Sequence, residues 1–283
     1  MCCAVHPIYT YRNTYSVNIL YNIFGFKLIF SSQMSQQIRV VKTSRGDCPQ
    51  IVRSLLEQTS RDSTDKVFSV GLSGGSVVDV LIEALPSADT DWSKWRFLLC
   101  DERLVAEDNP DNTYGQYARR LAPQLVKVER RQWLSVDTAL DPQQAADDYE
   151  RRVRQELCGA DSADQWPSVD VLVLGMGEDG HTCSLFPSHP LLEEKKRWIA
   201  AITDSPKPPP SRVTMTLPAV NASRLAIFVS LGASKAQTLY DMFVDHKPLP
   251  ASLVAPPSGR VVWLVDDASA RLLPPSVLST TVG

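Results

Sequence analysis

The chain has 283 residues, 43% of them hydrophobic, and a formal net charge of −3 at pH 7. This length provides a substantial core for one large α/β domain or two smaller ones. The small net charge gives no indication of a nucleic-acid partner or of electrostatic binding to a membrane. The six cysteines are scattered and form no Cys-x-x-Cys pair, which favours reduced thiols over a disulfide framework or a zinc site. We therefore expect a cytosolic protein.

The first 37 residues differ in composition from the rest of the chain. No Asp or Glu precedes Asp47, and the apolar stretch 17–30 is shorter than the roughly 20 residues that a membrane-spanning helix needs. A basic leader without acidic residues is typical of an organellar targeting segment. The alternative is a dispensable extension in front of a second start at Met34. Both remain open, and residues 1–37 are excluded from the predicted fold.

From residue 38 onward, strand-like and helix-like blocks alternate. Short apolar runs predict strands at 38–42, 67–70, 96–100, 132–136, 169–174, 198–203, 212–215, 224–230 and 260–265. Amphipathic blocks predict helices at 49–58, 77–85, 113–121, 142–157 and 232–244, and the proline-rich segment 205–210 predicts an exposed loop. Repeated strand–helix units indicate a mostly parallel sheet covered by helices. Without a repeat or a linker, we expect one domain over 38–275 and a flexible tail over 276–283.

The strand at 169–174 and the glycine turn behind it are the stretch around which the chain is organised. Its nearly continuous β-branched run predicts a strand buried on both faces, hence central and parallel. His181 follows the turn, and ligands of open α/β sheets bind beyond the carboxyl ends of strands. We expect His181 at the start of a helix, whose dipole keeps the imidazole neutral, as a general base requires. The alternative is a histidine of the core or a helix cap.

The glycine turn itself, residues 175–180, fits the G-x-G-x-x-G fingerprint of dinucleotide-binding proteins. That fingerprint needs an uninterrupted helix behind it to direct a dipole at the pyrophosphate. Pro187 and Pro190 would end such a helix after about two turns, so we expect no nicotinamide cofactor. No Cys/His cluster accompanies His181, so we expect no metal.

A second glycine loop, residues 71–76 (Gly-Leu-Ser-Gly-Gly-Ser), allows two interpretations. As a nucleophile elbow it would make Ser73 the nucleophile of a serine hydrolase, with Asp170 and His181 in the right order. However, Asp170 begins the strand whose far end carries His181, roughly 20 Å away at about 3.3 Å per residue, which is too far for a triad. Asp179 is the other carboxylate available. We favour an anion cradle, in which successive backbone N–H groups at a helix N-terminus face a phosphate.

Charged residues at other strand ends complete the pattern. Asp101-Glu102-Arg103 follows one predicted strand, Arg212 begins another, and Lys235 lies at the start of a helix. Singly, each is typical of a solvated surface charge or a salt-bridged loop. Together with the glycine loop, Arg212 and Lys235 would form a dianion site, because a phosphate favours a guanidinium fork and a point charge.

These blocks resemble the 6-phosphogluconolactonases of the glucosamine-6-phosphate isomerase/6-phosphogluconolactonase family. The resemblance covers residues 38–275 and is carried by 71–76, 101–103 with 112–114, 175–187, and 212–216 with 232–236. The related sugar-phosphate deaminases typically carry Asp-Glu-Tyr in place of residues 101–103 and Asn-Glu-Pro soon after the histidine. Arg103 and the run Ser-Leu-Phe-Pro at 184–187 therefore resemble the lactonases.

The resemblance implies a three-layer Rossmann-like α/β fold, a single catalytic domain without a cofactor, and hydrolysis of 6-phosphoglucono-δ-lactone in the oxidative pentose phosphate pathway. Our hypothesis makes His181 the base that activates water, Arg103 the group that stabilises the oxyanion, and Asp179 the residue that orients the imidazole. A purely turn-forming role for Asp179 remains open. We expect the substrate to contact Ser73, Gly74, Gly75, Ser76, Asp101, Arg212 and Lys235.

Three alternatives remain beside this hypothesis. They are a deaminase-like isomerase, a non-catalytic sugar-phosphate sensor on the same scaffold, and a serine hydrolase built on Ser73. In each of the first two cases the partner is a small sugar phosphate. We expect a monomer, without a nucleic-acid or membrane partner.

Overall fold

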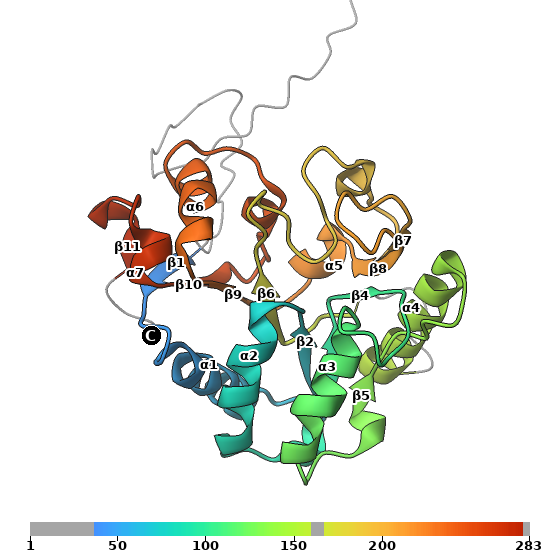
Figure 1. Cartoon of the computed structure of the whole chain (residues 1–283). Coiled ribbons are helices and arrows are strands. Elements are labelled where there is room, and N and C mark those ends of the chain that lie inside the picture. The colour runs from blue at the N-terminus through green and yellow to red at the C-terminus, as the bar shows by residue number, and fades with distance from the viewer. Residues whose placement is uncertain (1–36, 160–166, 280–283) are drawn as a thin grey trace, which may run out of the picture. The chain divides into compact units, whose positions relative to one another are not determined.

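A parallel eight-stranded sheet lies at the centre of the structure (Figure 1). The computed structural model describes residues 37–159 and 167–279, so the predicted leader lies outside the described residues except for Gln37. The strand order is β11-β1-β10-β9-β6-β2-β3-β5, and all neighbours are parallel. The strands are β1 (Gln37–Lys42), β2 (Phe68–Leu72), β3 (Trp95–Leu99), β5 (Trp133–Leu134), β6 (Val171–Gly175), β9 (Leu225–Ser230), β10 (Arg260–Val265) and β11 (Leu278–Ser279).

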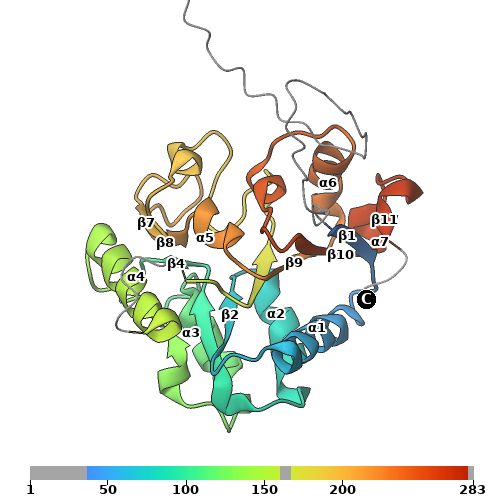
Figure 2. The same cartoon turned by 180° about the vertical axis from the view of Figure 1, so that it is seen from behind.

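Helices flank this sheet, as the alternating pattern predicted. They are α1 (Cys48–Asp62), α2 (Ser76–Ala84), α3 (Thr113–Arg120), α4 (Pro142–Cys158), α5 (Leu217–Asn221), α6 (Ala236–Phe243) and α7 (Asp267–Ala270). Figures 1 and 2 show α1, α2 and α3 as a row of neighbours, while α6 and α7 lie together beside β10. The mostly parallel α/β fold is confirmed. The predicted helix over 232–244 is divided into a 3-10 turn and α6.

The prediction of a central strand before the glycine turn is also confirmed. β6 lies between β9 and β2, and its residues 171–174 are fully buried. It begins two residues later than expected. Asp170, just before it, accepts hydrogen bonds of 2.8 Å from both the backbone N–H and the hydroxyl of Ser69 and pairs with Arg224 at 3.1 Å. The Asp170 carboxylate therefore makes its contacts at the amino end of β6, whereas His181 follows the carboxyl end.

Three strands form a separate antiparallel sheet that the sequence did not predict. β4 (Asp101–Arg103), β8 (Arg212–Met215) and β7 (Ile199–Ile202) are ordered β4-β8-β7. We expected the segments 198–203 and 212–215 to join the mostly parallel sheet, and we expected a loop at 101–103. The chain instead leaves β3 through Cys100, whose carbonyl accepts a bond from the Met215 N–H, and pairs with β8. A proline-rich loop joins β7 to β8 because its prolines cannot continue a ladder.

The carboxyl-terminal segment extends the central sheet further than expected. β11 pairs with β1 in parallel, with Val40 opposite Leu278 and Val41 opposite Ser279. We expected residues 276–283 to form a flexible tail. Residues 278 and 279 of that segment instead form β11 and belong to the sheet.

Glu102 connects β4 to the start of α3. Its side chain is fully buried and accepts bonds from the N–H groups of Arg103, Thr113 and Tyr114 at 2.8, 2.7 and 2.7 Å. Burial raises the pKa of Glu102 from 4.5 to about 7, against the opposing effect of these three donors. The carboxyl group holds the intervening loop closed and fixes the strand that carries Asp101 and Arg103.

This raised pKa predicts a pH dependence of stability. Between pH 4.5 and about 7 the folded chain retains a proton on Glu102 that the unfolded chain has lost. The contribution of Glu102 is therefore full below pH 4.5 and is lost as the pH rises through 7, by on the order of 3 kcal/mol. We expect Glu102→Gln to be less stable at low pH, because an amide has one acceptor oxygen, and to show a flatter profile. Urea unfolding at several pH values measures both, and parallel profiles would contradict the prediction.

Candidate active site

The candidate site lies where the chain leaves the carboxyl end of β6. Here the prediction of a following helix is wrong: residues 176–187 form turns and a short bridge between Thr182 and Leu185. Gly180 (φ 81°) and Cys183 (φ 51°) adopt left-handed conformations that an α-helix does not allow. His181 is therefore not at a helix N-terminus, and the dipole that we expected to act on it is absent. The loop also lacks the helix that the dinucleotide fingerprint requires.

His181 and Asp179 form the central pair of the site, called here the Asp179–His181 pair. His181 Nδ1 lies 2.5 Å from Asp179 Oδ1. The His181 side chain is 18% exposed and that of Asp179 is 35% exposed, so both reach solvent at the edge of the sheet. When Nδ1–H donates to the carboxylate, Nε2 carries the free lone pair. Among the described residues no hydrogen bond to Nε2 is found, which leaves this nitrogen for a ligand.

The electrostatic surroundings keep the imidazole neutral. Burial lowers the pKa of His181; Asp179 acts to raise it, and the Lys207 ammonium acts to lower it. The pKa of Asp179 is also lowered: burial acts to raise it, but the bonds and charges of His181 and Lys207 outweigh this effect. The expected neutral histidine thus results from burial and not from a helix dipole.

Gly177 makes the Asp179–His181 pair possible. A Cβ at this position would collide with Nδ1 and Cε1 of His181 and with Oδ1 of Asp179. The loop closes through bonds from the Gly177 N–H to the His181 carbonyl (2.9 Å) and from the Gly180 N–H to the Gly177 carbonyl (3.1 Å). These bonds place the imidazole directly over Cα of residue 177, so no larger residue fits there.

Lys207 belongs to this site, although we predicted only an exposed loop for its segment, residues 205–210. Its Nζ lies 3.2 Å from Asp179 Oδ1 and 3.4 Å from His181 Nδ1. The loop between β7 and β8 brings it there across 26 residues of chain. The one signal in the sequence was a single lysine inside a proline-rich loop. That signal becomes informative only once the antiparallel pairing of β7 with β8 is known.

Arg212 holds the loop that carries Lys207. We expected this residue to bind a phosphate, but its side chain is 2% exposed. Its Nε donates to the Pro209 carbonyl at 2.9 Å, and Nη2 donates to the carbonyls of Lys207 (2.7 Å) and Pro208 (3.2 Å). Only Nη1 is left, with a long contact of 3.4 Å to the Ser184 hydroxyl. A phosphate contact by Arg212 stays a prediction.

β4 places Asp101 and Arg103 on the same side as this loop. Asp101 is buried, and its Oδ2 accepts a 2.8 Å bond from the Ser184 hydroxyl. Arg103 lies opposite Arg212 in the β4–β8 register and donates from Nη1 to the Asp111 carbonyl at 2.9 Å. Its Nε is buried without a hydrogen-bond partner in the described structure. The predicted substrate contact Asp101 thus bonds the histidine loop, whereas Arg103 lies beside Arg212 on the neighbouring strand.

The glycine loop 73–76 and Lys235 flank the same edge. Gly75 (φ 67°) precedes α2, and the buried Ser73 hydroxyl has no partner in the part of the chain that is described. Among the described residues no base reaches Ser73, because its hydroxyl makes no hydrogen bond to Nε2 of His181 or to any other side chain. Lys235 is the N-cap residue of α6, without a capping bond from its side chain. In the same helix, the Thr238 hydroxyl donates to the Glu178 carbonyl. Burial and the charge of Lys207 lower the pKa of Lys235, against the opposing effect of Glu178.

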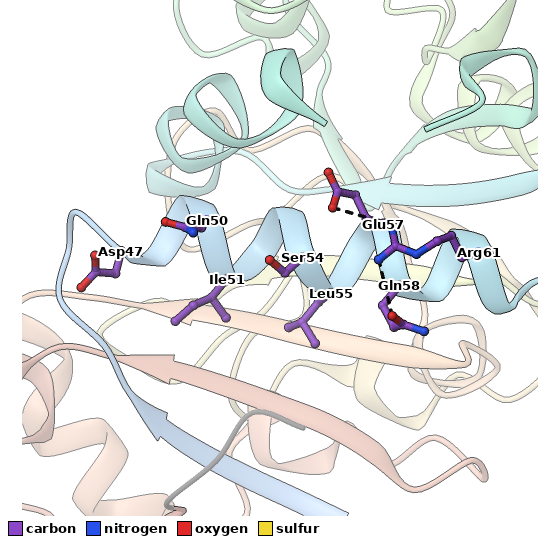
Figure 3. A pocket seen from close by; sticks show the side chains of 8 residues that line it. All are labelled: Asp47, Gln50, Ile51, Ser54, Leu55, Glu57, Gln58 and Arg61. Atoms are coloured by element: carbon purple, nitrogen blue, oxygen red, sulfur yellow. Dashed lines mark hydrogen bonds and ion pairs between the residues drawn. The ribbon is translucent and has the colours of Figure 1, made fainter. Parts of the chain in front are cut away.

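In the described part of the chain, no three or more His, Cys, Asp or Glu side chains lie together as a metal site would require. The helices of that part do not include one with the length and hydrophobicity of a membrane span. A surface groove runs along α1, lined by Asp47, Ile51, Leu55 and Arg61 among others (Figure 3). None of the candidate site residues lines it.

Comparison with known proteins decides the family. The sequence profile described as glucosamine-6-phosphate isomerases/6-phosphogluconolactonase matches residues 47–263. This chain belongs to that family. Among its members, the 6-phosphogluconolactonase of Homo sapiens is 46% identical over 73% of this chain and 81% of the human protein. A probable 6-phosphogluconolactonase of Drosophila melanogaster is 42% identical over 85% of this chain and 97% of its own.

A crystal structure from the same family supports the fold. The 6-phosphogluconolactonase of Thermotoga maritima superposes with a TM-score of 0.70 at 26% identity, covering 81% of this chain and all of that one. The family resemblance predicted from the motifs is confirmed.

The collision at Gly177 predicts a cost in stability. We expect Gly177→Ala to lower the free energy of unfolding by about 1–3 kcal/mol, because the new methyl group must displace the His181 ring. Gly46→Ala is the matched control, since a Cβ there meets only the Ser44 hydroxyl at 3.8 Å. Urea unfolding measures both variants. Equal stability of the two would contradict the described packing of the Asp179–His181 pair.

Proposed function

We propose that this chain hydrolyses 6-phospho-D-glucono-1,5-lactone to 6-phosphogluconate in the oxidative pentose phosphate pathway. The observation that carries the proposal is the Asp179–His181 pair, in which a neutral imidazole keeps Nε2 free at the edge of the sheet where ligands bind. The relatives named 6-phosphogluconolactonase support it. No cofactor takes part in the proposed reaction.

In the proposed reaction His181 acts as base and then as acid. Nε2 removes a proton from a water molecule, whose oxygen attacks the C1 carbonyl of the lactone. Arg103 stabilises the negative charge that forms on the carbonyl oxygen. The protonated imidazole then donates to the departing ring oxygen, the C1–O5 bond breaks, and the ring opens. Asp179 orients the imidazole and stabilises its positive charge between the two steps.

The remaining expected residues bind the substrate in this proposal. The loop of Ser73, Gly74, Gly75 and Ser76 holds the 6-phosphate together with Lys235. The donors are the backbone N–H groups of Gly74, Gly75 and Ser76, because the Ser73 N–H already donates to the Val173 carbonyl at 3.2 Å. Arg212 contributes through Nη1. Asp101 uses Oδ1, for which no hydrogen bond is found in the described structure, to accept a bond from a sugar hydroxyl. The deaminase alternative is disfavoured by Arg103 and by the run Ser-Leu-Phe-Pro after the histidine.

The proposal predicts the effect of removing the base. Purified protein accelerates the hydrolysis of the lactone above its spontaneous rate, and His181→Asn lowers kcat at least about a hundredfold, because a general base contributes typically 10²–10⁴-fold. Lactone consumption and acid release measure both. His246→Asn is the control, since His246 is exposed after the carboxyl end of α6 and its left-handed φ of 55° also suits Asn, and it retains wild-type turnover.

Each alternative gives a different result in the same assay. Ammonia release from glucosamine-6-phosphate would indicate the deaminase, and binding of sugar phosphates without turnover would indicate the sensor. Loss of activity in Ser73→Ala together with labelling by a fluorophosphonate would indicate the serine hydrolase. Near-normal turnover of His181→Asn would overturn the mechanism.

A separate prediction concerns the phosphate. We expect Lys235→Met to raise KM about 10–100-fold, the equivalent of one charged hydrogen bond of about 1.5–3 kcal/mol, while kcat changes only a few-fold. Lys94→Met is the control, because Lys94 is exposed before the amino end of β3, at the opposite edge of the sheet. Steady-state kinetics decide. A fall in kcat at unchanged KM would show that Lys235 acts on the reaction and not on binding.

A further inference from the structure

Lys207 is a charged residue in contact with the Asp179–His181 pair for which the proposed mechanism gives no role. We infer that Lys207 is a positioning residue, whose ammonium shares the Asp179 carboxylate with His181 and thereby sets the orientation and the charge state of the imidazole. The inference rests on the proposed function of His181 as the base. It assigns to the β7–β8 loop a part in the reaction.

The geometry gives the ammonium and the imidazole a common acceptor. Lys207 Nζ (3.2 Å) and His181 Nδ1 (2.5 Å) both approach the same oxygen, Oδ1 of Asp179. The ammonium is also 3.4 Å from Nδ1. With Nδ1–H and the ammonium both donating to Oδ1, Nε2 is left unprotonated, the form in which it can remove a proton from water.

The loop fixes where this ammonium can lie. Arg212 donates to the carbonyls of Lys207, Pro208 and Pro209. The Ser205 hydroxyl donates to the Lys207 carbonyl at 2.8 Å, and the Ser205 N–H donates to the Pro210 carbonyl at 3.2 Å. These bonds tie both ends of the loop and its centre. An exposed lysine on a free loop would lose this geometry to side-chain entropy, whereas here the backbone is already held.

The charges around the imidazole act in opposite directions. Asp179 on the same loop and Asp101 on β4 favour the protonated ring, while Lys207 on the β7–β8 loop and burial favour the neutral ring. Lys235 on α6 lies in the field of Lys207 and of Glu178. Without Lys207, burial would remain as the effect opposing stabilisation of the imidazolium by Asp179, because the ammonium is the positive charge within hydrogen-bond distance of the pair.

The test compares Lys207→Met with Lys207→Arg. We expect Lys207→Met to raise the pKa of His181 by about one unit, and the acidic limb of the kcat/KM profile to move upward by the same amount. At pH values below the limb this is a loss of up to about tenfold, while the plateau at higher pH changes only a few-fold. Lys207→Arg keeps the positive charge and restores the wild-type profile.

Two measurements separate this inference from the proposed function. NMR titration of the imidazole, assigned with His181→Asn, reports the pKa of His181 whether or not the lactone is the substrate, and kinetics report the reaction. Lys195→Met is the control, because Lys195 forms an exposed ion pair of 3.9 Å with Glu193. An unchanged titration of His181 in Lys207→Met, or an equal shift in Lys207→Arg, would overturn the inference.

Discussion

The contact between His181 and the backbone of Gly177 is the constraint on which the rest of the site depends. Two backbone hydrogen bonds close residues 177–181 into a loop, and the imidazole comes to lie where a Cβ of residue 177 would be. The same fold brings the Asp179 carboxylate to Nδ1. A helix after β6 would direct successive side chains around its axis and would separate these two groups. The absence of a side chain at residue 177 thus allows the imidazole to take this position.

The small antiparallel sheet provides the other half of the site. Its strands carry Asp101, Arg103 and Arg212, and its connecting loop carries Lys207. The Ser184 hydroxyl links the histidine loop to Asp101, and the Phe186 ring lies 4.6 Å from the His181 ring and 5.5 Å from the Arg212 guanidinium. Residues of the histidine loop therefore pack directly against this sheet. The loop after β6 of the parallel sheet carries the imidazole, and the antiparallel sheet carries charged residues of the candidate site.

The local patterns of the sequence predicted most of the elements. The strand β10 and the strand β8 begin and end at the predicted residues, and β6 was placed at the centre because its β-branched run has no polar face. His181 and its glycine turn were found because glycines and a histidine after a buried strand are a local signal. Asp179 was the residue expected to orient the imidazole, and the structure places the two side chains in contact.

Features that depend on pairing between distant segments could not be predicted from the sequence. β4 has three residues, two of them acidic and buried, and joins a strand more than 100 residues later. A short polar segment has no periodicity from which a strand could be predicted. The position of Lys207 and the loop-holding role of Arg212 depend on the antiparallel pairing of β7 with β8, which was not predicted either, so both were missed together. The helix expected after β6 was wrong because two left-handed residues, Gly180 and Cys183, are invisible to hydrophobic spacing.

In the proposed mechanism, Lys235 and Lys207 have different roles. Lys235 forms no ion pair with the described residues. Burial lowers its pKa, Glu178 acts to raise it, and the neighbouring Lys207 acts to lower it. A bound anion would offset the burial of this ammonium. Lys207 differs because Asp179 already neutralises part of its charge. We therefore propose that Lys235 binds the phosphate, while the Lys207 ammonium opposes protonation of His181.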